Sequence, residues 1–268
     1  MSLNKREHDP VRSLNLLWGS QTTPGRSGLT VRKIVEAGME IADEGGIEQL
    51  SMRKVAERLG VGAMSLYTYV PGKTELLELM VDAANAGLYP TEDIRSELGG
   101  DWRDAVRFIA KTNWELFMKH PWIVDLSGRR PVLGPHIFLK YEVELRALEG
   151  IGLADIEMDS TLSLILMHVE SCARLSNSMK SNRISTGVDD DEWWLNYAPA
   201  LERMVDWKRF PVASRVGVSA GQAHQNAYNP EHAYVFGLER IIEGTGVLIE
   251  RGKKDPANGN INRTDELR

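Results

Sequence analysis

The chain has 268 residues, of which 42% are hydrophobic and 26% charged, and its mean hydropathy is −0.30. This composition is typical of a folded protein in water and excludes a disordered or fibrous chain. No apolar run approaches the roughly 20 residues of a membrane-spanning helix, and the first ten residues lack the apolar stretch of a secretory signal. Cys172 is the only cysteine, which excludes an intrachain disulfide and a cysteine-based metal site. We therefore expect a cytoplasmic protein that has no membrane partner and needs no metal or cofactor.

Charge is unevenly distributed along the chain, whose formal net charge is −6. Residues 1–75 contain 10 Lys and Arg against 9 Asp and Glu, a net charge of +1, whereas the remainder, with 22 against 29, carries −7. Residues 51–73 hold four cations, Arg53, Lys54, Arg58 and Lys73, and a single acid, Glu57. This local charge of +3 suits a contact with nucleic acid, which the acidic total alone argues against.

Helical periodicity, divided by turn signals, runs through the N-terminal part of the chain. The stretch 19–28, rich in glycine and turn-forming residues, predicts that residues 1–28 form a flexible arm. Beyond it, apolar residues recur at helical spacing, with Ser51 as an N-cap and Gly60 as a terminating left-handed residue. The predicted helices span residues 30–45, 51–59, 63–70 and 74–87.

The C-terminal part also has the period of helices, and strand signals are nearly absent. Asp101 is placed to cap one helix, and Asn229-Pro230 opens the last one. Between residues 181 and 229, prolines and glycines predict an irregular segment with one short helix near 200–207. The other predicted helices span residues 101–119, 135–148, 155–179 and 230–252, followed by a polar tail at 253–268.

Residues 51–70 contain the clearest functional signal, two short helices joined by a turn at 60–62. This is the geometry of a helix-turn-helix motif. With Leu66 and Val70 directed inward, the second helix leaves small, hydroxyl-bearing and aromatic side chains free to face a DNA groove, and cations stand at both ends. The predicted DNA-binding residues are Arg53, Lys54, Ala63, Met64, Ser65, Tyr67, Thr68, Tyr69 and Lys73. An ordinary helical hairpin with a solvated basic face is the alternative interpretation.

The same residues carry a resemblance to a known family. Arg53-x-x-Ala56, Leu59-Gly60-Val61, Leu66-Tyr67-x-x-Val70 and Lys73-x-x-Leu76-Leu77 follow one another at fixed spacing. This pattern resembles the DNA-binding domain of the TetR (tetracycline repressor) family of bacterial transcription regulators, strongly over residues 29–85. The resemblance implies that Arg53 and Lys73 grip phosphates, that Ala63, Met64, Ser65 and Thr68 meet base edges, and that Tyr67 and Tyr69 contact backbone or sugar.

The resemblance continues weakly into the C-terminal part, through Asp101-Trp102-Arg103, His120-Pro121, Arg130-Pro131 and residues 236–240. It implies an all-α fold in which residues 29–75 form the helix-turn-helix DNA-binding domain and residues 76–252 a helical ligand-binding and dimerisation domain, linked by the helix at 74–87. The expected function is that of a ligand-responsive regulator, a repressor that binds a palindromic operator on double-stranded DNA.

The effector is expected to differ from tetracycline. The tetracycline repressor chelates a magnesium–drug complex through a histidine, and Asp125 or Leu126 stands near that place here, while Ile109 and Asn113 stand where polar drug ligands are expected. The apolar, tryptophan-rich interior suits an apolar or aromatic small molecule. The predicted pocket residues are Trp102, Ile109, Asn113, Phe117, Trp122, Phe138 and His168. As single polar residues on core faces, Asn113 and His168 are more typical of satisfied core residues than of ligand contacts, and Trp193-Trp194 is interpretable as a lid or as a loop anchor.

The last helix predicts a homodimer. Its apolar and small positions occupy more than one stripe, and the surplus requires a partner, which a four-helix bundle formed with the helix at 155–179 would supply. The predicted interface residues are Tyr234, Leu238, Ile241, Ile242, Thr245, Leu248 and Ile249. A helix buried wholly within one chain is the alternative.

Two other classes of protein are alternatives to a regulator. An enzyme is disfavoured because HExxH, CxxC, P-loop and dinucleotide motifs are absent, and because His168 and Glu170 point in nearly opposite directions on a helix. A ligand-sequestering or protein-interaction module that has lost DNA contact fits the helical pattern. Salt-dependent DNA binding separates that module from a regulator.

Overall fold

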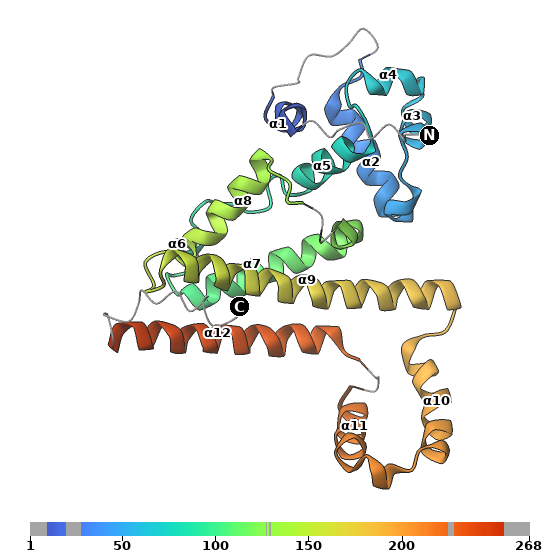
Figure 1. The fold of residues 1–268 in the computed structure, drawn as a ribbon, viewed down its shortest axis with the longest axis vertical. Helices are drawn as coiled ribbons and strands as arrows, with labels where there is room; N and C mark the ends of the chain where they lie inside the picture. The colour runs from blue at the N-terminus through green and yellow to red at the C-terminus, as the bar shows by residue number, and fades with distance from the viewer. Residues whose placement is uncertain (1–9, 20–27, 127, 129, 225–227, 255–268) are drawn as a thin grey trace, which may run out of the picture.

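The computed structural model describes residues 10–19, 28–126, 128, 130–224 and 228–254, and all regular structure within them is helical (Figure 1). The helices are α1 (Pro10–Trp18), α2 (Val31–Gly45), α3 (Met52–Leu59), α4 (Ala63–Tyr67), α5 (Lys73–Ala84), α6 (Ile94–Glu97), α7 (Trp102–Lys119), α8 (Pro135–Arg146), α9 (Asp155–Thr186), α10 (Asp190–Met204), α11 (Pro211–His224) and α12 (Pro230–Lys254). Short 3₁₀ helices lie at η1 (Ile47–Gln49), η2 (Pro121–Leu126) and η3 (Trp207–Arg209). Among the described helices, none has the length and apolar character needed to cross a membrane.

The helices form three groups in space (Figure 1). Helices α1 to α5 gather at one end around their own apolar core, and α5 leads from this unit into the body. In the body, α9 packs against both α7 and α12. Helices α10 and α11 project from the far end of α9 as an arm. The chain thus separates a small helical head from a larger helical body and joins them through α5.

Capping residues and glycines fix the ends of the head helices where the sequence predicts them. The Ser51 hydroxyl accepts a hydrogen bond of 3.2 Å from the Lys54 amide, and the Thr30 hydroxyl accepts one of 3.2 Å from Lys33. Gly60 ends α3 in the left-handed conformation, at φ 65°, which favours glycine. The prediction at 63–70 is too long by about one turn, since α4 ends at Tyr67 and the residues after it form a turn.

Residues 1–28 were predicted to be a flexible arm, and for residues 10–18 this prediction is wrong. These residues form α1, which packs on α5 and buries Ser13 and Leu16. The Trp18 indole N–H donates to the Leu133 carbonyl at 2.8 Å, and its ring meets Phe138 edge-on at 5.8 Å. Contacts with distant parts of the chain therefore hold this helix. Residues 1–9 and 20–27 lie outside the described residues, as does the predicted tail beyond Lys254.

The prediction of an irregular segment at 181–229 is also wrong over most of its length. Helix α9 continues to Thr186, and α10 and α11 follow with only short connections. The Asp189 side chain caps α10 by accepting from the Glu192 amide at 2.8 Å, and Pro199 is accommodated inside that helix. The prolines and glycines that predicted an irregular segment are thus compatible with helices in this part of the chain. The short helix α6 was not predicted from the sequence.

Two aspartates tie the head to the body. Asp43 of α2 accepts a hydrogen bond of 2.7 Å from the Trp122 indole and contacts His120 Nδ1 at 2.8 Å. Asp82 of α5 is buried and accepts from the backbone amides of His136 and Ile137, at 3.0 and 3.1 Å.

Asp82 therefore caps the N-terminus of α8 from another helix, where the amide donors and helix dipole favour a negative charge. Its second oxygen lies 2.7 Å from His136 Nδ1. Gly134 makes the approach possible, because a Cβ atom there would lie 2.1 Å from Asp82 Oδ1.

Replacing Asp82 by alanine should lower the free energy of unfolding by about 1–3 kcal/mol, because two amides and a histidine lose their acceptor in a buried site. Urea unfolding followed by circular dichroism measures the change. The control is Asp93→Ala, which removes an exposed cap from the short helix α6 and should cost no more than about 1 kcal/mol. A larger loss for the control would contradict the role given to Asp82.

Candidate functional site

Helices α3 and α4 form a helix-turn-helix whose second helix presents one face outward. Residues 60–62 connect the two helices, and Leu66 and Val70 are completely buried against the head core. Met64 is 78% exposed, and Ser65, Tyr67 and Thr68 are exposed beside it. Ala63 and Tyr69 are partly buried against the core. Four of the six residues predicted to face a DNA groove are therefore exposed to solvent, and the other two are partly buried.

The predicted DNA-binding cations Arg53, Lys54 and Lys73 already have contacts of their own. Arg53 is exposed and lies 3.4 Å from Glu57 on its own helix. Lys54 hydrogen-bonds the Gln49 side chain, and the Lys73 ammonium donates to the Ile47 carbonyl at 3.2 Å. Because surface contacts of this kind contribute little free energy, a phosphate group can replace them.

Arg58 differs from the other three cations. Its guanidinium donates to the Glu44 carboxylate at 2.8 Å and to Glu40 at 3.3 Å, both on α2. The hydrogen bond to Glu44 raises the pKa of Arg58 above its usual range. Arg58 is thus committed to holding α3 against α2, and the cations available to DNA are Arg53, Lys54 and Lys73.

The seven predicted pocket residues do not line a common cavity. Trp102 and Phe117 belong to the body core, Ile109 to a smaller core with Val143, and Trp122 to the head core. Phe138 is 49% exposed and packs on Trp18. His168 hydrogen-bonds the Tyr234 carbonyl at 3.0 Å. Four of the seven residues thus face cores, and the cores are three separate ones.

Asn113, the remaining predicted pocket residue, belongs to a buried polar cluster between α7 and α8. Its side-chain amide donates to Glu144 Oε1 at 2.8 Å and to the Tyr89 hydroxyl at 3.1 Å. Glu144 is only 1% exposed, accepts a hydrogen bond from Tyr89 and pairs with Lys140 at 2.7 Å. Burial, followed by the charge of Glu144, raises the pKa of Tyr89, which keeps its phenol protonated.

A small cavity of about 130 Å³ adjoins this cluster, between the end of α5 and α8. Tyr89, Lys140, His136 and Asn85 contribute to its lining. Asn85 is 6% exposed; its amide donates to the Val81 carbonyl at 2.8 Å, and its carbonyl oxygen is buried without a hydrogen-bond partner. Sequence reasoning missed all of these residues except Asn113, because they come from segments up to 55 positions apart and no local spacing connects them.

The predicted interface residues on α12 lie mostly inside the protomer. Leu238, Ile242, Thr245 and Ile249 are buried against α7 and α9, while Tyr234 and Ile241 are half-buried. Only Leu248 of the seven is exposed. The periodicity found the most apolar stripe of α12, and the protomer's own core takes that stripe. The exposed apolar residues lie on the next face, at Val235, Phe236 and Val247 of α12 and at Leu164 and Met167 of α9.

Comparison with known proteins agrees with this architecture. Residues 34–80 match the family model described as "Bacterial regulatory proteins, tetR family", and residues 96–249 match "Tetracyclin repressor-like, C-terminal domain". The chain is 36% identical to the HTH-type transcriptional repressor DrrR1 of Streptomyces coeruleorubidus, over 92% of this chain and 90% of that protein. It belongs to the TetR family.

Other relatives have the same organisation. The repressor Rv1353c of Mycobacterium tuberculosis is 28% identical over 87% of this chain and 89% of its own length. The structure of ActR from Streptomyces coelicolor in complex with actinorhodin superposes with a TM-score of 0.66, at 25% identity, over 81% of this chain and 94% of that one.

Membership of the TetR family identifies this chain as a DNA-binding transcription regulator and not an enzyme. The first family model covers most of α2, all of α3 and α4 and the first two-thirds of α5, and the second covers most of the body and the arm. The all-α fold and the family predicted from the sequence are confirmed.

Proposed function

We propose that this protein is a ligand-released repressor that binds a palindromic operator as a homodimer in the cytoplasm. The observation that carries this proposal is the continuity of α5, which shares the apolar core of the head with the helix-turn-helix and ends at the cavity beside Asn85 in the body. Support comes from relatives, since DrrR1 is named a transcriptional repressor and ActR was solved with actinorhodin bound.

The exposed face of α4 is proposed to enter the major groove. Met64, Ser65 and Thr68 offer an apolar contact and two hydroxyl groups to base edges, and the Ala63 methyl group stands at the first turn. Tyr67 and Tyr69 would contact backbone or sugar, and Arg53, Lys54 and Lys73 would contact phosphates. Base contacts then set the sequence preference, while the cations supply affinity for any duplex.

Arg53→Ala should weaken binding about three- to tenfold on every duplex and flatten the salt dependence, because each phosphate contact releases counterions. Ser65→Ala and Thr68→Ala should instead change which sequences are selected. Binding-site selection from random duplexes, followed by fluorescence anisotropy at several salt concentrations, measures both effects. Lys111→Ala, an exposed cation of α7, is the control and should bind as the wild type does. If selection enriches no motif, the chain would be a ligand-sequestering module and not a repressor.

Dimerisation is proposed through the exposed face of α9 and α12. Leu164, Met167, Val235, Phe236 and Val247 form an apolar surface that a monomer would leave in water. Two such helix pairs related by a two-fold axis make a four-helix bundle. Gly244 favours a close approach, since a Cβ atom there would meet nothing within 4 Å. The axis would set two copies of α4 about 34–36 Å apart, one turn of DNA.

Val247→Asp should convert the dimer to a 30.0 kDa monomer and abolish operator binding, because it places a charge in the apolar interface. Sedimentation velocity at micromolar concentration measures the mass. Leu98→Asp makes the same change at an exposed residue outside α9 and α12 and should leave a dimer. A wild-type particle of 30.0 kDa would contradict the proposal. Ile241 is a poorer position for the test, because it also packs in the protomer core.

The effector is proposed to bind at the cavity between α5 and α8. At about 130 Å³ the cavity holds only a small group, so a drug-sized molecule would have to displace α8 from α5. That displacement strains the cap that Asp82 makes on α8 and so moves α5 with the head. A ligand that binds the displaced state more tightly lowers DNA affinity by the difference between its two affinities. The side-chain carbonyl of Asn85 has no hydrogen-bond donor. We therefore expect an aromatic or apolar effector that carries a hydroxyl or amino group to supply one.

Asn85→Leu, which keeps the branched shape of the side chain but removes its acceptor and its donor, should leave operator affinity within about twofold and raise the effector concentration for half-release at least about tenfold. Operator release by a small-molecule set that includes actinorhodin measures this by anisotropy. Asn182→Leu, at an exposed position near the end of α9, is the control. Equal release of both variants by a compound that releases the wild type would contradict the site.

A further inference from the structure

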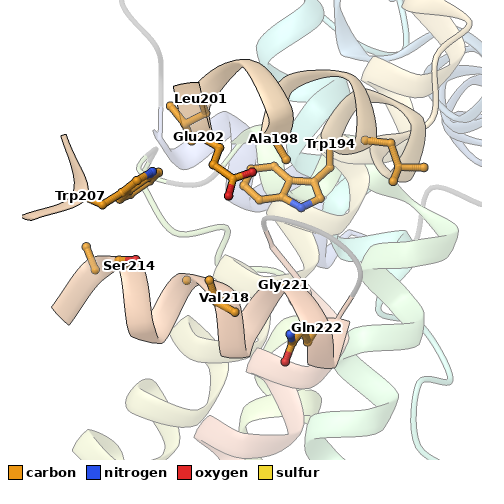
Figure 2. A pocket seen from close by; sticks show the side chains of 12 residues that line it. Trp194, Ala198, Leu201, Glu202, Trp207, Ser214, Val218, Gly221 and Gln222 are labelled. Atoms are coloured by element: carbon orange, nitrogen blue, oxygen red, sulfur yellow. The ribbon is translucent and has the colours of Figure 1, made fainter. Parts of the chain in front are cut away.

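A second cavity lies in the arm, apart from the cavity at α5 and α8. It measures about 650 Å³ and lies between α10 and α11, with Trp207 of η3 closing one end (Figure 2). Cavities of this volume accommodate drug-sized molecules. Both walls come from a single chain, so the cavity does not need a second protomer to form.

Small residues make up much of the α11 wall, beside Val218 and Gln222. Ala213, Gly217 and Gly221 recur every four positions, on one face of the helix. A Cβ atom at Gly217 would meet nothing within 4 Å, and one at Gly221 would lie 3.8 Å from the Trp194 indole nitrogen. No side chain of this helix therefore fills the space at Gly217, and a flat ring can lie against the backbone.

The opposite wall, from α10 and η3, is aromatic and negatively charged. Figure 2 shows the Glu202 carboxylate directed into the cavity, between the indoles of Trp194 and Trp207. Glu202 is the only charged residue among the twelve that line the cavity. Trp193 instead stacks on Tyr197 at 4.5 Å, and neither ring lines the cavity. The sequence could not distinguish the two tryptophans, and the structure gives a lining role to Trp194 alone.

We propose that the arm cavity is a second ligand site, which binds a planar aromatic cation. The ring system stacks on an indole and lies against the glycine face of α11, and the positive charge pairs with Glu202. An anion of the same shape is repelled by that carboxylate. The site is independent of the operator and of the cavity at α5, so its failure in a test leaves the proposed function unaffected.

A second copy of the chain is the competing occupant, and the structure offers it a different surface. Trp193, Tyr197, Val212 and Val216 are exposed on α10 and α11 and do not line the cavity. A partner protomer that covers these residues leaves the space between the two helices open. Charge complementarity with Glu202 therefore favours a small cation as the occupant of the cavity itself.

The test compares two dyes that share a xanthene ring, cationic rhodamine 6G and anionic fluorescein, by fluorescence anisotropy with the full-length protein. Rhodamine 6G should bind at least about tenfold more tightly than fluorescein, and Glu202→Gln should remove most of that difference. Gly217→Leu places a side chain in the open space of the cavity and should weaken rhodamine binding by at least about tenfold. Since leucine favours helix over glycine, this variant should remain folded.

Glu192→Gln and Ser219→Leu make the same changes at exposed residues of α10 and α11 outside the lining, and both should bind rhodamine as the wild type does. Equal affinity for the two dyes, or undiminished rhodamine binding by Gly217→Leu and Glu202→Gln, overturns the proposal. Absence of binding by a dimer whose arm tryptophans are shielded from acrylamide quenching also overturns it, in favour of a second protomer as the occupant.

Discussion

The buried carboxylate of Asp82 is the contact on which the relation between head and body depends. It lies on α5 and accepts hydrogen bonds from two backbone amides in the first turn of α8, with the His136 ring beside it. A buried charge is tolerated only while such donors surround it, so the position of α5 against α8 is restricted to hydrogen-bonding range. Asp43 makes a second tie, to Trp122 and His120. Trp18 adds a third tie, to Leu133 and Phe138. A change in the body can reach the DNA-reading surface through these contacts.

The polar cluster around Glu144 shows a related constraint within the body. Its carboxylate is fully buried and compensated by Lys140, Asn113 and Tyr89, which come from three separate segments. Removal of any one donor would leave part of a buried charge unsatisfied. Asn85, at the edge of the same region, retains an acceptor without a partner. The hydrogen-bond acceptors of Glu144 are satisfied, whereas the Asn85 carbonyl oxygen lacks a donor. A ligand that supplies this donor would therefore be favoured here.

The long helices serve several surfaces at once, which explains why single apolar stripes were misleading. Helix α12 directs Leu238, Ile242 and Ile249 into the protomer core and leaves Val235 and Val247 on an outer face. Gly237 allows the inner packing, because a Cβ atom there would lie 2.2 Å from His168. In the arm, α10 and α11 face each other across a cavity and present a second apolar surface outward. Periodicity in the sequence shows that a helix has apolar faces. It does not show which other helix, or which protomer, packs against each face.

The sequence by itself determined the helical fold, the family, the caps at Ser51 and Asp101, the glycine end of α3 and the inward positions of Leu66 and Val70. These features depend on residues within one or two turns of each other, where spacing and backbone chemistry are sufficient. Only the tertiary structure decided that residues 10–18 form a helix, that the arm is helical, and that four of the predicted pocket residues belong to three separate cores. It alone brought Tyr89, Asn113 and Glu144 together and placed Glu202 in the wall of the cavity that faces α11. Each of these outcomes depends on contacts between distant segments, which leave no period in the chain because folding, and not sequence spacing, makes those residues neighbours.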